Sequence, residues 1–114
     1  MVFTVEPDHH PDHKAVFEAV ETVFRHRSLI LYRPHRRDLG IPAPNLWVPL
    51  DEEDLDAKCK ALKGYRKAYK PVMGERLYLN ENTIRAIARV DGQVSNTEYA
   101  EALRVYRMVD FLKF

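Results

Sequence analysis

The sequence predicts an α/β fold, because short apolar segments of strand length alternate with longer segments whose apolar residues recur at helical spacing. Residues 2–5 and 46–50 are rich in β-branched, aromatic or aliphatic side chains, and residues 28–32 (SLILY) form a continuous run that is almost entirely apolar. Such a run is typical of a strand that is buried on both faces of a parallel sheet. We therefore expect a small, mostly parallel sheet with helices packed on it, in a single domain that spans residues 1–114.

The first helix is predicted to begin at Pro11, because a proline lacks the N–H that the first helical position leaves unbonded. Its apolar residues recur at helical spacing and should form one packing stripe, made of Val16, Ala19, Val20, Val23 and Phe24. In the segment 46–50, Pro49 cannot donate to a sheet, so this strand is expected at an edge or to end there.

The second helix should follow Asp51, a good N-cap with acidic residues behind it, and should end near Pro71 and Gly74. Its buried stripe is predicted at Leu55, Cys59, Leu62, Tyr65 and Tyr69. A third helix is expected over about residues 82–91 with Gly92 beyond its end. The segment from residue 99 to the last residue fits a helix or a strand equally well.

Composition excludes several classes of protein. The net charge of +1 provides no general attraction to nucleic acid or to anionic membranes. No apolar run approaches the roughly 18 residues of a membrane helix. One cysteine, Cys59, excludes an internal disulfide and suits a reducing compartment. We expect a cytoplasmic protein without a membrane span, for which nucleic acid is not an expected partner.

Three histidines occur within five positions, in the stretch PDHHPDHKAVFEAV at the start of the first helix. His10 and His13 stand one helical turn apart, and neutral imidazole is a common zinc ligand. Asp12 between them is placed to hold a ring N–H. A catalytic zinc needs three protein ligands, however, and a capped, solvated helix start explains the same residues. The spacing alone leaves both interpretations open.

Basic residues flank the strand 28–32 and its exit, and Arg33, Arg36 and Arg37 are candidates for binding a substrate or an anion. The alternative is a solvated loop whose charge is balanced by the acidic residues between positions 51 and 56. The loop lacks the interleaved aromatic residues that bind single-stranded nucleic acid.

Three segments, in order, resemble the PIG-L/LmbE-like zinc-dependent N-deacetylases: VFTVEPDHHPDHKAVFEAV, PNLWVPLDEEDLDAKCKALKGYRKAY and IARVDGQVSNTEYAEALRVYR. The first resembles the family's second metal motif, in which a strand and a turn precede H-P-D-H at the start of a helix. The resemblance implies a Rossmann-like three-layer fold and zinc-dependent hydrolysis of N-acetyl groups on N-acetylglucosamine-type conjugates.

The same resemblance implies roles for individual residues. His13 matches the metal-ligand histidine, and His10 matches the histidine that stabilises the oxyanion and protonates the leaving amine. Asp12 matches the aspartate that orients and tunes His10. Asn45 matches a turn residue beside the site, and Glu101 matches a glutamate to which we assign a site-supporting role, with Arg89 as one candidate partner.

The family also has an N-terminal motif, A-H-P-D-D-E, which supplies the other metal ligands and the general base and which is absent from this sequence. We therefore expect the chain to correspond to the C-terminal half of such an enzyme. It should bind Zn²⁺ only with ligands from an N-terminal half, and it is expected to be inactive without that half. The alternative is a non-catalytic module that self-associates or binds anions.

Overall fold

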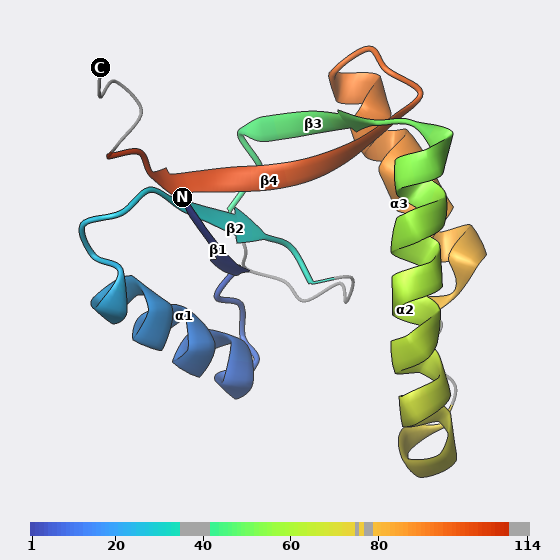
Figure 1. The fold of residues 1–114 in the computed structure, drawn as a ribbon, viewed down its shortest axis with the longest axis horizontal. Helices are drawn as coiled ribbons and strands as arrows, with labels where there is room; N and C mark the ends of the chain where they lie inside the picture. The colour runs from blue at the N-terminus through green and yellow to red at the C-terminus, as the bar shows by residue number, and fades with distance from the viewer. Residues whose placement is uncertain (35–41, 75, 77–78, 110–114) are drawn as a thin grey trace. The chain divides into compact units, whose positions relative to one another are not determined.

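The computed structural model describes residues 1–34, 42–74, 76 and 79–109. These residues form three helices and a four-stranded mixed sheet (Figure 1). In chain order the elements are β1 (Val2–Val5), α1 (Pro11–Val23), β2 (Leu29–Tyr32), β3 (Leu46–Leu50), α2 (Glu52–Met73), α3 (Glu81–Val94) and β4 (Tyr99–Arg107). The predicted α/β class is confirmed. The segment that begins at residue 99, whose pattern fitted a helix or a strand equally well, is a strand as far as Arg107. No helix in the described part of the chain has the length and hydrophobicity needed to cross a bilayer.

The sheet has the order β1-β2-β4-β3, and only β1 and β2 are parallel. The prediction of a mostly parallel sheet is therefore wrong, because the apolar period of a strand carries no information about its direction. Ile30 in β2 pairs with Phe3 on one side and with Val105 of the antiparallel β4 on the other. This central position explains the apolar run of β2. β3 lies at an edge, as Pro49 predicts, since an edge strand tolerates a missing N–H.

The described residues fall into two compact units, one within 1–46 and 102–109 and the other within 47–101. In the first unit, Arg107 of β4 binds the end of α1. Its guanidinium donates hydrogen bonds to the carbonyl oxygens of Phe24 (2.9 Å) and Arg27 (3.1 Å), and it forms an ion pair with Glu21 (3.3 Å). A cation at the carboxyl end of a helix donates hydrogen bonds to carbonyl oxygens that lack a partner in the helix, and it interacts favourably with the helix dipole. α1 has no basic residue in its own last turn, so β4 supplies that cation.

The predicted apolar stripe of α1 is not buried. No residue of this helix is buried, and Val16 (48%) and Val23 (72%) are among its exposed side chains. α1 instead contacts the sheet through Phe17, whose ring packs edge-on against Tyr106 at 5.2 Å between centroids. Helical spacing identifies an apolar face, but only the tertiary structure shows whether another element covers it.

The second unit has a core formed by Leu55, Cys59, Ile84, Ala88 and Tyr99, with Leu50 and Leu62 packed against it. Burial raises the pKa of the Cys59 thiol, which agrees with its role as a small core residue. The prediction that Tyr65 and Tyr69 are buried is wrong, since both are exposed. α2 has 22 residues and α3 has 14, and the last turns of α2 extend past the start of α3 (Figure 1).

Asp51 caps α2 in a reciprocal pair of hydrogen bonds. Its carboxylate accepts the Asp54 N–H (2.7 Å), and the Asp54 carboxylate accepts the Asp51 N–H (3.2 Å). Asp51→Ala should lower the free energy of unfolding by about 1 kcal/mol, because it leaves the Asp54 N–H without its acceptor. Asp51→Asn keeps an acceptor and should lose only a few tenths of a kcal/mol. Urea unfolding of both variants measures the difference, and equal losses would contradict the capping role.

Candidate functional site

The predicted histidine pair lies in the first unit, where the chain passes from the carboxyl end of β1 into α1. The Glu6 N–H donates to the carbonyl oxygen of Tyr32 (2.8 Å), so the pairing with β2 continues one residue beyond β1. The turn after it carries His10, which is the N-cap of α1, and α1 carries His13 in its first turns. Ligand sites of α/β proteins commonly occur at the carboxyl ends of parallel strands.

Asp8 is the carboxylate that contacts His13. Its Oδ1 lies 2.7 Å from Nδ1 of His13 and also accepts the His10 N–H at 2.8 Å. The Asp8 side chain is fully buried (0% exposed), whereas the His13 side chain is 23% exposed. His13 thus contacts the buried Asp8 carboxylate on one side of its ring and retains some access to solvent.

The two predicted site histidines lie next to each other. The rings of His10 and His13 stack with their centroids 4.7 Å apart. Nδ1 of His10 accepts the backbone N–H of Asp12 at 3.1 Å, which caps the helix. The Asp12 carboxylate is 4.0 Å from the same nitrogen and its side chain is 87% exposed. The Asp12 carboxylate therefore lies beyond hydrogen-bond distance of this ring nitrogen.

Glu6 and Asp8 are not among the site residues that the sequence predicts. Glu6 is fully buried and binds Arg104 of β4 through two guanidinium nitrogens, with Nη2 at 2.6 Å from Oε1 and Nε at 3.1 Å from both oxygens. These hydrogen bonds to Glu6 raise the pKa of Arg104. The signal available in the sequence was two acidic residues beside a proline, directly before the histidines.

Asn45 directly precedes β3, and its side chain takes part in backbone pairing. Its Oδ1 accepts the Val105 N–H at 2.7 Å, and its own N–H donates to the carbonyl oxygen of Leu103 at 3.0 Å. These two bonds hold the backbone on both sides of Arg104, the residue that binds Glu6. Asn45 thus binds the stretch of β4 that carries Arg104.

The other predicted site residues lie elsewhere or are not described. Glu101 belongs to the second unit and pairs there with Lys58, with Nζ and Oε2 2.5 Å apart, rather than with Arg89. Arg33 is partly buried at the end of β2. Arg36 and Arg37 lie outside the described residues.

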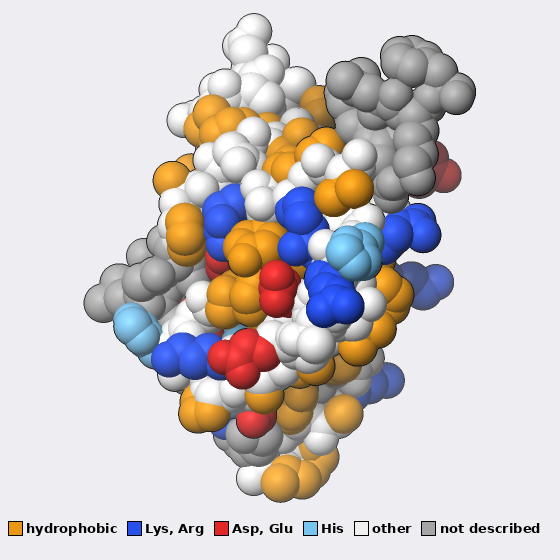
Figure 2. Space-filling model, turned by 90° about the vertical axis from the view of Figure 1, so that its left-hand side faces the viewer, with side chains coloured by type: hydrophobic (Ala, Val, Ile, Leu, Met, Phe, Trp, Pro, Cys, Tyr) orange, Lys and Arg blue, Asp and Glu red, His pale blue; other side chains and the backbone are white. Residues whose placement is uncertain are grey.

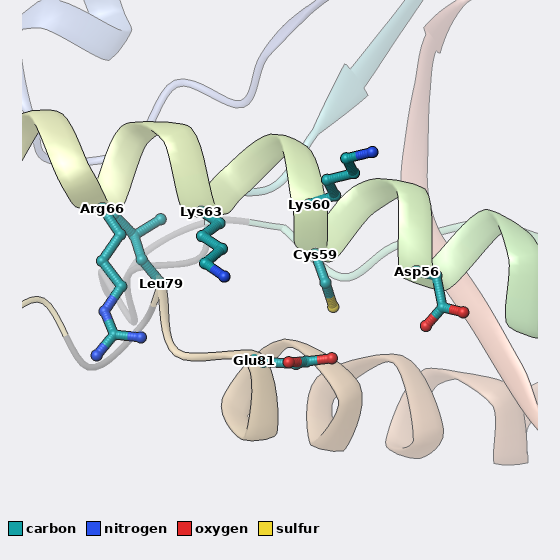
Figure 3. A pocket seen from close by; sticks show the side chains of 7 residues that line it. All are labelled: Asp56, Cys59, Lys60, Lys63, Arg66, Leu79 and Glu81. Carbon is teal, nitrogen blue, oxygen red and sulfur yellow. The ribbon is translucent and has the colours of Figure 1, made fainter.

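A cavity of about 320 Å³ lies in the second unit, between α2 and the start of α3 (Figure 3). Lys63 and Arg66 project from the side of α2 that faces α3, whereas Lys60 points away from α3. Both carboxylates of the lining bind Arg85, which lies outside it. The mixed charge identifies no class of ligand. The full lining is Asp56, Cys59, Lys60, Lys63, Arg66, Leu79 and Glu81.

A complete metal centre does not form within the part of the chain that the structure describes, since no three His, Cys, Asp or Glu side chains converge there. His13 with its buried carboxylate has the chemistry of one zinc ligand and its hydrogen-bond partner. No model of a protein family matches the chain, and no curated protein is significantly similar to it.

Proposed function

We propose that this chain supplies the C-terminal part of a PIG-L-type zinc-dependent N-deacetylase, which hydrolyses N-acetyl groups on N-acetylglucosamine-type conjugates. The observation that carries the proposal is the H-P-D-H motif at a strand-to-helix junction, with the rings of His10 and His13 4.7 Å apart. The parallel pair β1–β2 and helix α1 then form part of a Rossmann-like three-layer fold, whose remaining strands extend the sheet beyond β1.

In this proposal His13 is one of three protein ligands of the zinc ion. Zinc, when bound, lowers the pKa of a water ligand and polarises the amide carbonyl. His10 stabilises the oxyanion and protonates the leaving amine. Because Nδ1 of His10 accepts the Asp12 N–H, the neutral ring carries its proton on Nε2, which leaves that nitrogen as the donor. Asp12 places a carboxylate 4.0 Å from the same ring, on the side of Nδ1.

The partner in this proposal is a polypeptide that carries the A-H-P-D-D-E motif of the same family. Two features of the first unit support a missing neighbour of this kind. β1 is an edge of the described sheet, and its Phe3 side chain is 55% exposed. Val16 and Val23 of α1 and Phe24 directly after it are also exposed, and hydrophobic side chains are interleaved with charged ones on the face that Figure 2 shows. An unpaired strand edge beside apolar side chains favours the addition of a further strand.

The test is complementation with an N-terminal fragment of a deacetylase of this family, in the presence of Zn²⁺. Amine release from an N-acetylglucosamine conjugate is measured for the chain alone, for the fragment alone and for the mixture. We expect activity only in the mixture, and we expect His13→Ala to reduce it at least about 100-fold because a metal ligand is lost. Glu18→Gln, an exposed change on the same helix, is the matched control and should retain full activity.

Two results would contradict the proposal. The first is amide hydrolysis at a normal enzymatic rate by the chain alone. The second is a folded, associated mixture that stays inactive, or whose activity survives His13→Ala. If the chain instead forms a stable dimer by light scattering and binds no fragment, the exposed edge serves self-association, which is the non-catalytic alternative.

A further inference from the structure

We infer that Asp8 is the positioning residue that presents Nε2 of His13 to the metal. The inference deepens the proposed function and rests on it for the identity of the ligand. It concerns a residue to which neither the histidine spacing nor the family resemblance assigned a role. Its basis is the contact of 2.7 Å between Oδ1 of Asp8 and Nδ1 of His13.

An ionised carboxylate can only accept hydrogen bonds, so the short contact places a proton on Nδ1 of His13. In the neutral ring the lone pair is then on Nε2, the nitrogen on the far side from Asp8. A histidine binds a metal through its unprotonated nitrogen, and the hydrogen bond at the other nitrogen selects which one that is. Asp8 thus leaves His13 in the tautomer that a metal ligand at Nε2 requires.

Burial and connectivity make Asp8 suited to this role. Its side chain is fully buried, so bulk water does not compete for Oδ1. The same oxygen accepts the His10 N–H at 2.8 Å, which orients the carboxylate relative to the start of α1. The contrast is Asp12, whose exposed carboxylate lies at 4.0 Å from the nearest histidine nitrogen. Of the two aspartates that flank the histidines, Asp8 has the geometry that can orient a ring.

A purely structural role for Asp8 would be to shape the turn before α1 through the His10 N–H. The ring nitrogen of His13 that carries the proton distinguishes this structural role from the positioning role. We expect the neutral His13 ring of the wild-type, metal-free chain to carry its proton on Nδ1. Two-dimensional ¹H–¹⁵N spectra of the ring nitrogens measure this directly. A His13 ring with its proton on Nε2 in the wild type overturns the inference.

Two substitutions of Asp8 test whether its side chain selects the tautomer of His13. Asp8→Asn keeps an oxygen that can accept both N–H groups, so it should retain the Nδ1–H tautomer. Asp8→Ala removes the acceptor, so His13 should become a mixture of both tautomers. The control Glu18→Gln should leave the His13 signals unchanged. If Asp8→Ala does not fold, the wild-type and Asp8→Asn spectra still decide, because each must show the proton on Nδ1.

Metal binding provides the second measurement. The mixture of this chain with the N-terminal fragment is titrated with Zn²⁺ while the His13 ring signals are followed. We expect Asp8→Ala to weaken binding at His13 by about 10- to 100-fold, with Asp8→Asn between it and the wild type. Equal affinity in all three proteins overturns the inference. The expected tautomer together with an inactive complemented mixture would refute the deacetylase proposal and leave the orientation of His13 by Asp8 intact.

Discussion

Arg104→Met is expected to lower the free energy of unfolding by about 3–5 kcal/mol, because it leaves the charge of Glu6 buried without its partner. Glu6 is fully buried, and the Arg104 side chain is 20% exposed. Both carboxylate oxygens lie within hydrogen-bond distance of the guanidinium. Urea unfolding followed by circular dichroism measures the loss. Arg89→Met, an exposed change in α3, is the matched control and should change stability by less than about 0.5 kcal/mol.

The double variant Glu6→Leu with Arg104→Met shows whether the loss arises from the isolated charge. A buried ion pair can be replaced by apolar groups at little net change in stability, so the double variant should recover most of the loss. A loss below about 1 kcal/mol in Arg104→Met would contradict the buried pair. The pair also stabilises the end of β1 just before Asp8, and we expect the His13 ring signals to shift in Arg104→Met.

Gly92→Ala is expected to lower the free energy of unfolding by about 3 kcal/mol, because a Cβ atom at this position would overlap with backbone. That atom would lie 2.6 Å from the Thr97 oxygen and 2.7 Å from the Glu98 oxygen. Neither oxygen can move without shifting the chain that leads into β4, and overpacking of this kind typically costs about 1–3 kcal/mol. Thermal unfolding of the wild type and of Gly92→Ala measures the loss in stability.

Gly64→Ala is the matched control, because Gly64 is also inside a helix and a Cβ atom there would have no atom within 4 Å. This substitution should raise the free energy of unfolding by about 0.5–1 kcal/mol, since alanine is the better helix former. Opposite signs for the two variants are the expected result. A stabilising Gly92→Ala would contradict the close approach of Thr97 and Glu98 to α3.

Gly92 also shows why one helix end was misplaced. A glycine after an apolar helical segment usually marks the end of a helix, so the sequence predicts an end at residue 91. In the structure α3 continues to Val94, and the residue with a positive φ (56°) is Asn96. The glycine is required by the close approach of residues 97–98 to the helix, and contacts of that kind do not appear in a local pattern.

The order and type of the elements could be predicted from the sequence because their signals are local. Pro11 begins α1, Asp51 caps α2, and the run 28–32 contains β2. The adjacency of His10 and His13 also follows from local spacing along a helix. These features depend on residues within a few positions of each other, and backbone sterics and capping act at that range.

The tertiary structure alone decided which groups surround the histidines and how the strands run. Glu6 and Arg104 are separated by 98 positions, and no pattern in either segment indicates the other. The antiparallel direction of β4 and the exposure of the apolar residues of α1 likewise depend on which segments meet in space. Burial and the pairing of charges depend on how the whole chain packs. The site residues could therefore be predicted from the sequence, whereas the side chains that bind them could be identified only in the tertiary structure.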